Sequence, residues 1–295
     1  MTFTETAQKP AEPPPVFVCG RFTLELTRPL IMGIVNVTPD SFSDGGQFSN
    51  AQQAIDHAAT LVAQGADILD IGGESTRPGA VPVSVEQELD RVMPVLEGVI
   101  KLNVPVSIDT RRPAVMREAI AAGVDILNDV NGFRDEEAFH LASESPCGLC
   151  IMHMQGEPQT MQREPYYNDV VAEVLGFLLA QRDRFCAAGV QAQRLLIDPG
   201  FGFGKTFDHN LSLLRAVGQF ARSHPTLVGV SRKSLIGSLL AQGSGQAPPG
   251  PAQRVAGSVA AALWAASQGA QVLRVHDVAD TAQALKVWQA LKIPA

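Results

Sequence analysis

The sequence predicts an α/β protein, a (β/α)8 TIM barrel with an N-terminal β-hairpin. The chain has 295 residues, 45% of them hydrophobic, which suits one large barrel with a substantial core. Eight short apolar runs recur along it, as expected of parallel strands that are buried on both faces. These runs are Ile31–Val35, Ile68–Ile71, Val104–Ile108, Ile126–Leu127, Leu149–Met152, Leu195–Ile197, Leu227–Val230 and Val272–Val275.

Two segments precede the first of these runs. Residues 1–15 are polar and proline-rich, so we expect a disordered tail. The segment Val16–Leu26 reads as a short hairpin that turns at Cys19-Gly20-Arg21. Residues 16–295 are then expected to form one domain.

Helix-like segments separate the apolar runs, and glycine follows several of them as a stop signal. Alternating strands and helices favour a barrel over the main rival, a doubly wound sheet. That rival would bring a G-x-G-x-x-G fingerprint after its first strand, and the sequence has none there. The clearest helical segments are Ala51–Gln64, Pro113–Ala122 and Val170–Ala188.

Composition narrows the choice of partners and compartment. The net charge of −7 provides no global basic field, which argues against nucleic acid. Residues Cys147 and Cys150 form a single C-x-x-C without a second pair, so we interpret them as ordinary core thiols. The sequence shows no signal peptide and no apolar stretch long enough for a membrane span, and a cytoplasmic protein is expected.

The segment Asp198–Thr206, DPGFGFGKT, looks at first like a phosphate-binding P-loop. Its register is wrong, because Gly200 lies one residue too close to Gly204 and Pro199 takes the place of the first glycine. What remains is an acidic residue at a strand end, followed by a glycine-rich loop.

Polar side chains recur where the other apolar runs finish, which is the catalytic face of a barrel. Carboxylates and amides, Asp109, Asn128 and Asp198, suit a ligand rich in N–H donors. A basic set suits an anion such as phosphate. One such Asp is as readily a helix cap, but capping does not explain the whole set. The sequence therefore indicates a heterocycle that carries a phosphate tail. The basic set is Arg77, Lys233, Arg274 and His276, and Asn36, Asp70 and His153 complete the rim.

Two loops on that face are rich in Gly, Pro and Ser. They span residues 36–46 and 72–79. Composition of this kind is typical of mobile lids that exclude water from a site.

Six motifs stand out along the chain: NVTPDSFSDGG, DIGGESTRPG, MHMQGEPQTMQ, DPGFGFGKT, GVSRKSLIG and RVHDV. Together they resemble dihydropteroate synthase. The resemblance runs from about Val16 to Lys292 and keeps the motifs in the family's order. It implies that 6-hydroxymethyl-7,8-dihydropterin pyrophosphate is joined to 4-aminobenzoate, giving 7,8-dihydropteroate and pyrophosphate for folate synthesis. It also implies a TIM barrel, Mg²⁺ as cofactor and a homodimer.

The resemblance also implies roles for individual residues. Asn36 would meet the metal, Arg274 and His276 would hold pyrophosphate, and Asp109, Lys233 and Arg77 would serve catalysis. The pterin would be bound by Thr76, Asp109, Asn128, Asp198 and Lys233. The aminobenzoate pocket, where sulfonamides compete, would be walled by Phe42, Pro78, Phe203 and Ser234.

One divergence and two rivals stay open at this point. The run Arg111-Arg112-Pro113 is more basic than the family pattern, which leaves its local contacts undefined. A methyltetrahydrofolate:corrinoid methyltransferase would share the pterin site but would need no pyrophosphate grip. A catalytically silent paralogue would have lost loop residues, yet Asn36, Asp40, Thr76 and Arg77 are present.

Overall fold

The structure is a computed structural model that describes residues 15–38, 47–75, 83–157, 159–243 and 245–291. Its described part contains a two-stranded antiparallel hairpin and one eight-stranded parallel sheet. The hairpin strands are β1 (Val16–Cys19) and β2 (Phe22–Glu25). The sheet strands are β3 (Leu30–Asn36), β4 (Ile68–Gly72), β5 (Val106–Asp109), β6 (Ile126–Asp129), β7 (Gly148–Met152), β8 (Leu195–Asp198), β9 (Leu227–Val228) and β10 (Val272–Val275).

The sheet runs in the order β8-β7-β6-β5-β4-β3-β10-β9, so each strand pairs with the next along the chain except where β3 meets β10. A parallel bridge between Ile197 and Thr226 joins β8 to the segment before β9 and brings the sheet close to a complete ring. The predicted TIM barrel with its hairpin is confirmed. Strand lengths differ in detail, because β5 begins at Val106 and β9 contains two residues.

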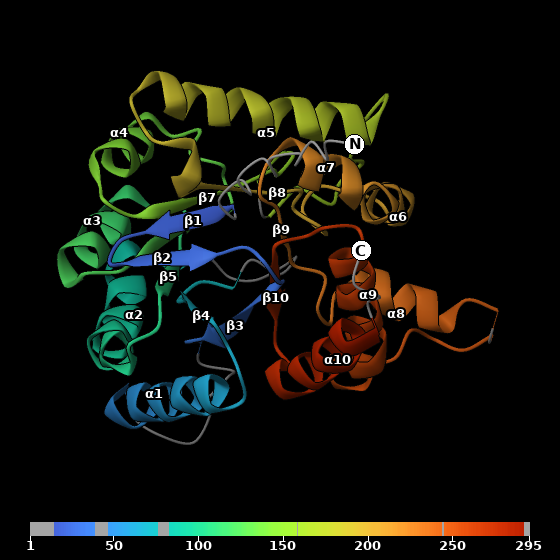
Figure 1. The fold of residues 1–295 in the computed structure, drawn as a ribbon, viewed down its shortest axis with the longest axis horizontal. Coiled ribbons are helices and arrows are strands. Elements are labelled where there is room, and N and C mark those ends of the chain that lie inside the picture. Colours follow the sequence, from blue (N-terminus) through green and yellow to red (C-terminus); the bar gives the residue numbers. More distant parts are fainter. Residues whose placement is uncertain (1–14, 39–46, 76–82, 158, 244, 292–295) are drawn as a thin grey trace, which may run out of the picture.

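Helices surround this sheet, as Figure 1 shows. The predicted helix Pro113–Ala122 is α3 without change, and Gly123 ends it in the left-handed region at φ 94°. The other α-helices are α1 (Gln47–Ala63), α2 (Val85–Val99), α4 (Glu136–Glu144), α5 (Val170–Ala187), α6 (Phe207–Arg215), α7 (Val217–Ser223), α8 (Ser234–Ala241), α9 (Val255–Ser267) and α10 (Val278–Leu291), with short 3-10 turns η2 (Ile100–Leu102), η3 (Ala192–Arg194) and η4 (Pro251–Arg254).

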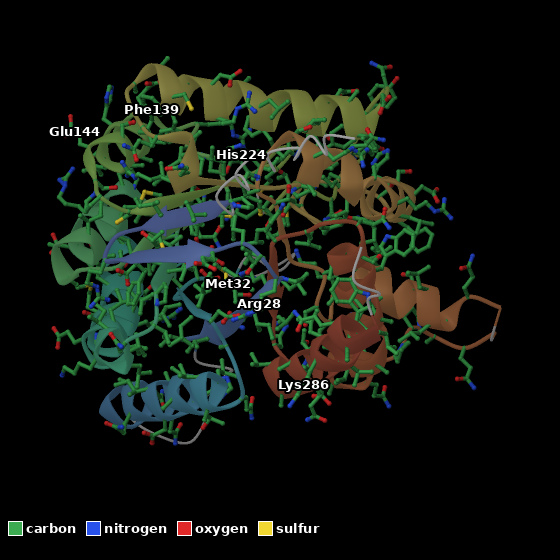
Figure 2. The ribbon with its side chains drawn as sticks, viewed as in Figure 1. Arg28, Met32, Phe139, Glu144, His224 and Lys286 are labelled. Carbon is green, nitrogen blue, oxygen red and sulfur yellow. The ribbon has the colours of Figure 1, made fainter. Side chains whose placement is uncertain are left out.

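The strands are apolar on both faces because both faces are covered. Outward-facing residues such as Leu69 and Ile71 pack with the inner faces of the helices in the main core. Figure 2 places Met32, which is fully buried, within the ring of helices and Glu144 at its edge. Cys147 and Cys150 are buried free thiols, as expected. None of the described helices is long and apolar enough to cross a membrane.

The hairpin closes one end of the barrel. Phe17 and Cys19 pack in a second core with residues near the starts of the strands, including Met32 and Ile68. Gly148, at the start of β7, leaves room for this plug, since a Cβ there would lie 2.5 Å from the Phe17 ring. With the amino-terminal ends of the strands covered, a ligand must approach the opposite end, where the strands finish.

Candidate active site

Strand register brings the predicted polar residues to one level of the rim. Asn36 pairs with Gly72, Gly72 with Asp109, and Asp109 with Asn128. Two strands further on, Met152 pairs with Asp198. These side chains come from β3, β5, β6 and β8, and the pairing of successive parallel strands brings them to one edge of the sheet.

Arg274 on β10 joins two carboxylates at this rim. Its Nε donates to Asp70 at 2.6 Å and its Nη2 donates to Asp109 at 2.7 Å. Burial alone would lower the pKa of Arg274, but these two carboxylates raise it above its usual value. Burial raises the pKa of Asp109 to about 7, although Arg274 opposes that shift. The resemblance assigns Arg274 to pyrophosphate, and the structure places it against two carboxylates of the rim.

Asp70 is a site residue to which sequence reasoning gave no role. Its side chain is fully buried, and its two carboxylate oxygens each lie 3.4 Å from Nδ2 of Asn128. It therefore orients both Asn128 and Arg274. The signal that could have identified it is a single charged residue inside the apolar run Ile68–Ile71, where a buried carboxylate needs partners.

Lys233 lies across the rim from this cluster, at the N-cap of α8. Its ammonium donates to the carbonyl of Phe201 and lies 4.6 Å from the centre of the Phe203 ring. Burial lowers the pKa of Lys233 to about 8, with Asp198 acting in the opposite direction. Burial raises the pKa of Asp198, while Lys233 and Gly200 favour its charged form.

The glycine-rich loop after β8 is shaped by contact with the segment that follows β7. The amide of Gly200 donates to Asp198 Oδ1 at 2.7 Å. Gly200 has φ 68°, and a Cβ on it would lie 1.9 Å from the carbonyl oxygen of His153, so only glycine fits. As the sequence register indicated, this loop does not have the arrangement of a P-loop, because Lys205 is buried and bonded within the protein.

The remaining described candidates lie around these residues. His276 contacts Ser231 Oγ through its backbone N at 3.2 Å and through Nδ1 at 3.1 Å. Ser234 is exposed at the first residue of α8. The candidates Phe42, Thr76, Arg77 and Pro78, together with the predicted lid behaviour of their loops, lie outside the described residues.

The donor set for a metal is small. In the part of the chain that the structure describes, no group of three or more His, Cys, Asp and Glu residues could hold an ion. Asn36 offers one amide oxygen at the end of β3, beside Gly72. A single neutral oxygen fits Mg²⁺ that keeps several waters and is held mainly by substrate phosphates, and it does not fit a tightly bound structural metal.

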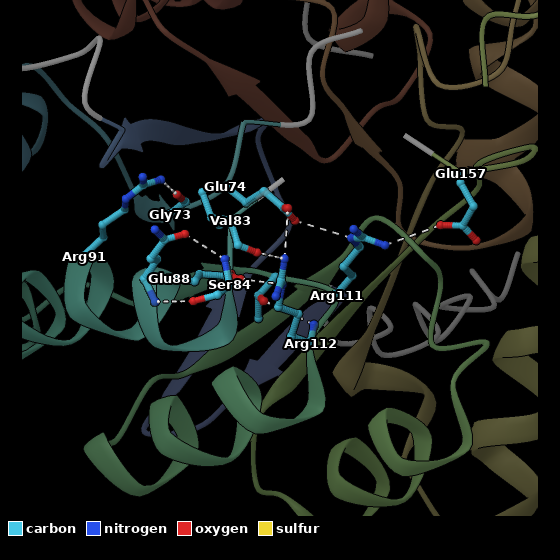
Figure 3. Close-up of polar contacts among 11 residues, drawn as sticks. Gly73, Glu74, Val83, Ser84, Glu88, Arg91, Arg111, Arg112 and Glu157 are labelled. Atoms are coloured by element: carbon cyan, nitrogen blue, oxygen red, sulfur yellow. Dashed lines mark hydrogen bonds and ion pairs between the residues drawn. The ribbon is translucent and has the colours of Figure 1, made fainter. Parts of the chain in front are cut away.

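The basic run after β5 forms a charged network on this face, shown in Figure 3. Arg112 Nη2 donates to Glu74 at 3.1 Å and to the carbonyl of Val83, while its Nε lies 3.0 Å from the buried carboxylate of Glu88. Arg111 reaches Glu74 and Glu157, each at 3.4 Å. Arg111 and Arg112 therefore link the loops that follow β4, β5 and β7.

Comparison with known proteins places this site in a family. The model of the "Pterin binding enzyme" family matches residues 32–276. Dihydropteroate synthase of Neisseria meningitidis serogroup B is 53% identical over 94% of this chain and 98% of its own length. The Escherichia coli K12 enzyme of the same name is 48% identical over 91% of this chain and 93% of its own.

Solved structures agree with that assignment. Dihydropteroate synthase from Xanthomonas albilineans, in complex with 4-aminobenzoic acid, has a TM-score of 0.88 at 48% identity and covers 96% of this chain and 100% of its own. The Burkholderia cenocepacia enzyme, complexed with 7,8-dihydropteroate, has a TM-score of 0.84 at 49% identity over 94% and 96% of the two chains. Fold and rim thus define a pterin-binding barrel enzyme. Within that class, the chain belongs to the dihydropteroate synthase family.

Proposed function

We propose that this chain condenses 6-hydroxymethyl-7,8-dihydropterin pyrophosphate with 4-aminobenzoate to give 7,8-dihydropteroate and pyrophosphate. The observation that carries the proposal is the rim itself, where buried Asp198 and Asn128 and half-buried Asp109 lie near Lys233 and Arg274 in a chain of this family. Two relatives of known structure are complexed with 4-aminobenzoic acid and with 7,8-dihydropteroate.

The rim residues match the edges of a pterin. Its amino group and ring N–H groups are donors, which suit the carboxylates of Asp198 and Asp109 and the amide oxygen of Asn128. Its carbonyl and ring nitrogens are acceptors, which suit Lys233. Because these groups are buried or half-buried, a ligand that failed to pair with them would leave charges without partners. The site would therefore select among ligands by hydrogen bonding.

The reaction breaks the bond between the pterin methylene carbon and the pyrophosphate oxygen, and both electrons leave with pyrophosphate. The resulting cation is delocalised over the pterin ring. The aminobenzoate nitrogen then donates its lone pair to the methylene carbon and loses a proton. Asp109 and Lys233 supply fixed charges around this carbon, and Arg274 and His276 accept the departing anion. No nucleophile from the protein is required.

Mg²⁺ is proposed as cofactor: Asn36 would be its protein ligand, and substrate phosphates and waters would supply the other ligands. When bound, it would neutralise charge on the leaving group. Omitting the metal should reduce turnover and weaken pyrophosphate binding, and calorimetry with and without Mg²⁺ measures the second effect directly.

A homodimer is proposed from the exposed apolar side chains of the last three helices. Leu240 on α8, Trp264 on α9, and Val287 and Leu291 on α10 are all exposed, and α9 packs against both neighbours. Sedimentation equilibrium should give a dimer at micromolar concentration. Val287→Glu combined with Leu291→Glu should shift it towards monomer, and a wild-type monomer would contradict the proposal.

The test of function is turnover of the two purified substrates. We expect dihydropteroate and pyrophosphate in equal amounts when Mg²⁺ is present. Ligand binding without turnover would instead identify a silent paralogue. If the protein bound the pterin but not pyrophosphate, the methyltransferase class would be favoured, because it needs no pyrophosphate-binding residues.

A further inference from the structure

Lys205, the lysine of the glycine-rich segment, turns into the protein instead of towards the ligand face. Only 3% of its surface is exposed. Its Nζ lies 3.0 Å from Nδ1 of His153, 3.2 Å from the carbonyl oxygen of His153 and 3.0 Å from the carbonyl oxygen of Phe203. The mechanism above does not use this buried charge.

The three contacts of Lys205 require Nζ to donate one N–H to each of three acceptors. Two are carbonyl oxygens, which only accept, and the third is an imidazole nitrogen whose role depends on its proton. Burial, followed by the charge of Lys205, lowers the pKa of His153 to about 3, so the ring is neutral and Nδ1 can accept. Three acceptors around one Nζ match the three N–H bonds of an ammonium group. Burial lowers the pKa of Lys205 well below its usual value and Lys233 adds to that shift, while Asp198 opposes it, so the three acceptors are what favour the ammonium form.

These bonds add to the side-chain packing between the two segments, where Phe203 lies against a cluster that contains Met152 and Met154. Gly200 and Gly204 press against the backbone of residues 153–155, and a Cβ on Gly204 would lie 2.4 Å from the carbonyl oxygen of Gln155. Gly200, Gly202 and Gly204 all have positive φ, so the loop gains little rigidity from its own backbone. Lys205 holds the loop to His153 from inside.

The same loop supports Lys233. The carbonyl of Phe201 accepts a hydrogen bond from the Lys233 ammonium, and the Phe203 ring lies beside that ammonium. Lys205 fixes the carbonyl of Phe203 itself. A displacement of the loop would therefore move two of the groups that orient Lys233, although Lys205 does not touch the ligand site.

We propose that Lys205 is a positioning residue that holds the loop 200–204 against His153 and thereby sets Lys233 and Phe203 for the pterin and aminobenzoate. This inference rests on the proposed function. The P-loop-like motif suggests that Lys205 binds phosphate. In this proposal its ammonium instead binds acceptors of the protein itself and takes no part in binding phosphate.

Lys205→Met tests the proposal, because methionine has a similar length but no ammonium. Calorimetry would measure 6-hydroxymethyl-7,8-dihydropterin and inorganic pyrophosphate as separate ligands. We expect at least a tenfold loss of affinity for the pterin, a change of less than twofold for pyrophosphate, and a raised KM for aminobenzoate. Lys286→Met, at an exposed lysine of α10, is the matched control and should change none of these.

His153→Phe provides a second variant should Lys205→Met fail to fold. It keeps an aromatic ring and removes the Nδ1 acceptor, and we expect a smaller loss of pterin affinity with pyrophosphate binding retained. If either folded variant bound the pterin as wild type does, or lost both ligands equally, the positioning role would be wrong. A wild-type protein that bound neither ligand would instead overturn the proposed function.

Discussion

At the scale of single residues, the site depends on charges that share partners. Arg274 serves Asp70 and Asp109 together, and Asp70 also faces Asn128. Removal of Arg274 would therefore leave two carboxylates in the rim without their cation, besides weakening any grip on pyrophosphate. A substitution of Arg274 is therefore expected to disturb the binding of both the pterin ring and pyrophosphate.

The pH dependence of pterin binding follows from two groups. Asp109, with a pKa of about 7, carries its charge only above that pH, and Lys233, with a pKa of about 8, carries its charge only below that pH. The affinity for 6-hydroxymethyl-7,8-dihydropterin should therefore be highest between these values and fall on both sides. Asp109→Asn should abolish the acidic limb alone. An acidic limb that persisted in this variant would assign it to another group.

Asp198 is predicted to be the main acceptor for the donor edge of the pterin. Asp198→Ala removes a buried charged acceptor and should weaken plain pterin binding by about 2–4 kcal/mol. Asp198→Asn is the control, since its amide oxygen can still accept from the Gly200 amide. Unchanged affinity in the alanine variant would show that Asp198 only caps its own loop.

At the scale of elements, local caps fix the starts of helices, and bonds between elements fix the loops. Ser84 and Gln87 cap the start of α2 reciprocally, and Thr206 with His209 does the same for α6. Arg112, just after β5, connects Glu74 after β4 with Val83 before α2. Local sequence favours the start of each helix, whereas bonds between elements, such as those of Arg112, place α2 against the barrel.

Arg112 should contribute substantially to stability. Glu88 is 1% exposed and burial raises its pKa, so it needs the Arg112 charge, and Arg112→Met should cost about 3 kcal/mol of unfolding free energy. Arg111→Met, which removes longer and more exposed pairs, should cost less than about 1 kcal/mol.

Chemical denaturation of a double variant tests whether Glu88 is the cause of this loss of stability. Adding Glu88→Leu to Arg112→Met removes the unpaired buried carboxylate and should restore most of the lost stability. Equal losses in the single and double variants would mean that Glu88 is not the reason for the effect.

At the scale of the whole molecule, the barrel gathers one ligand site from most of its strands and plugs the opposite end with the hairpin. Arg21 in the hairpin turn is bonded to Asp125, just before β6, with the Nη2 to Oδ2 distance at 2.8 Å. The described residues that would contact pterin and aminobenzoate meet at Lys233 and Phe203. A ligand bound at one position would thus be expected to order groups used by the other.

That arrangement predicts coupling between the ligands. A sulfonamide or aminobenzoate should bind measurably only when pyrophosphate with Mg²⁺, or the pterin substrate, is already present, because the first ligand bears an ordering cost that the second avoids. Titration of a sulfonamide into the free protein and into the protein with pyrophosphate and Mg²⁺ measures the difference. Equally tight binding in both cases would show a preformed pocket.

The sequence by itself determined the architecture and the composition of the rim. Apolar runs with helical segments between them predict a parallel barrel, and Asp109, Asn128 and Asp198 follow from their positions at strand ends. Local patterns carry this information because burial on two faces, turns and caps act between residues close in the chain.

Only the tertiary structure decided how these residues are paired. Arg274 meets Asp70 across 204 positions of sequence, and Lys205 turns inward to His153 across 52. Such pairs depend on strand register, on barrel closure and on which charges remain buried together, and no local period of the chain encodes these. The physical reason is that a buried charge is stable only beside its partner, and the fold alone determines which partner is near.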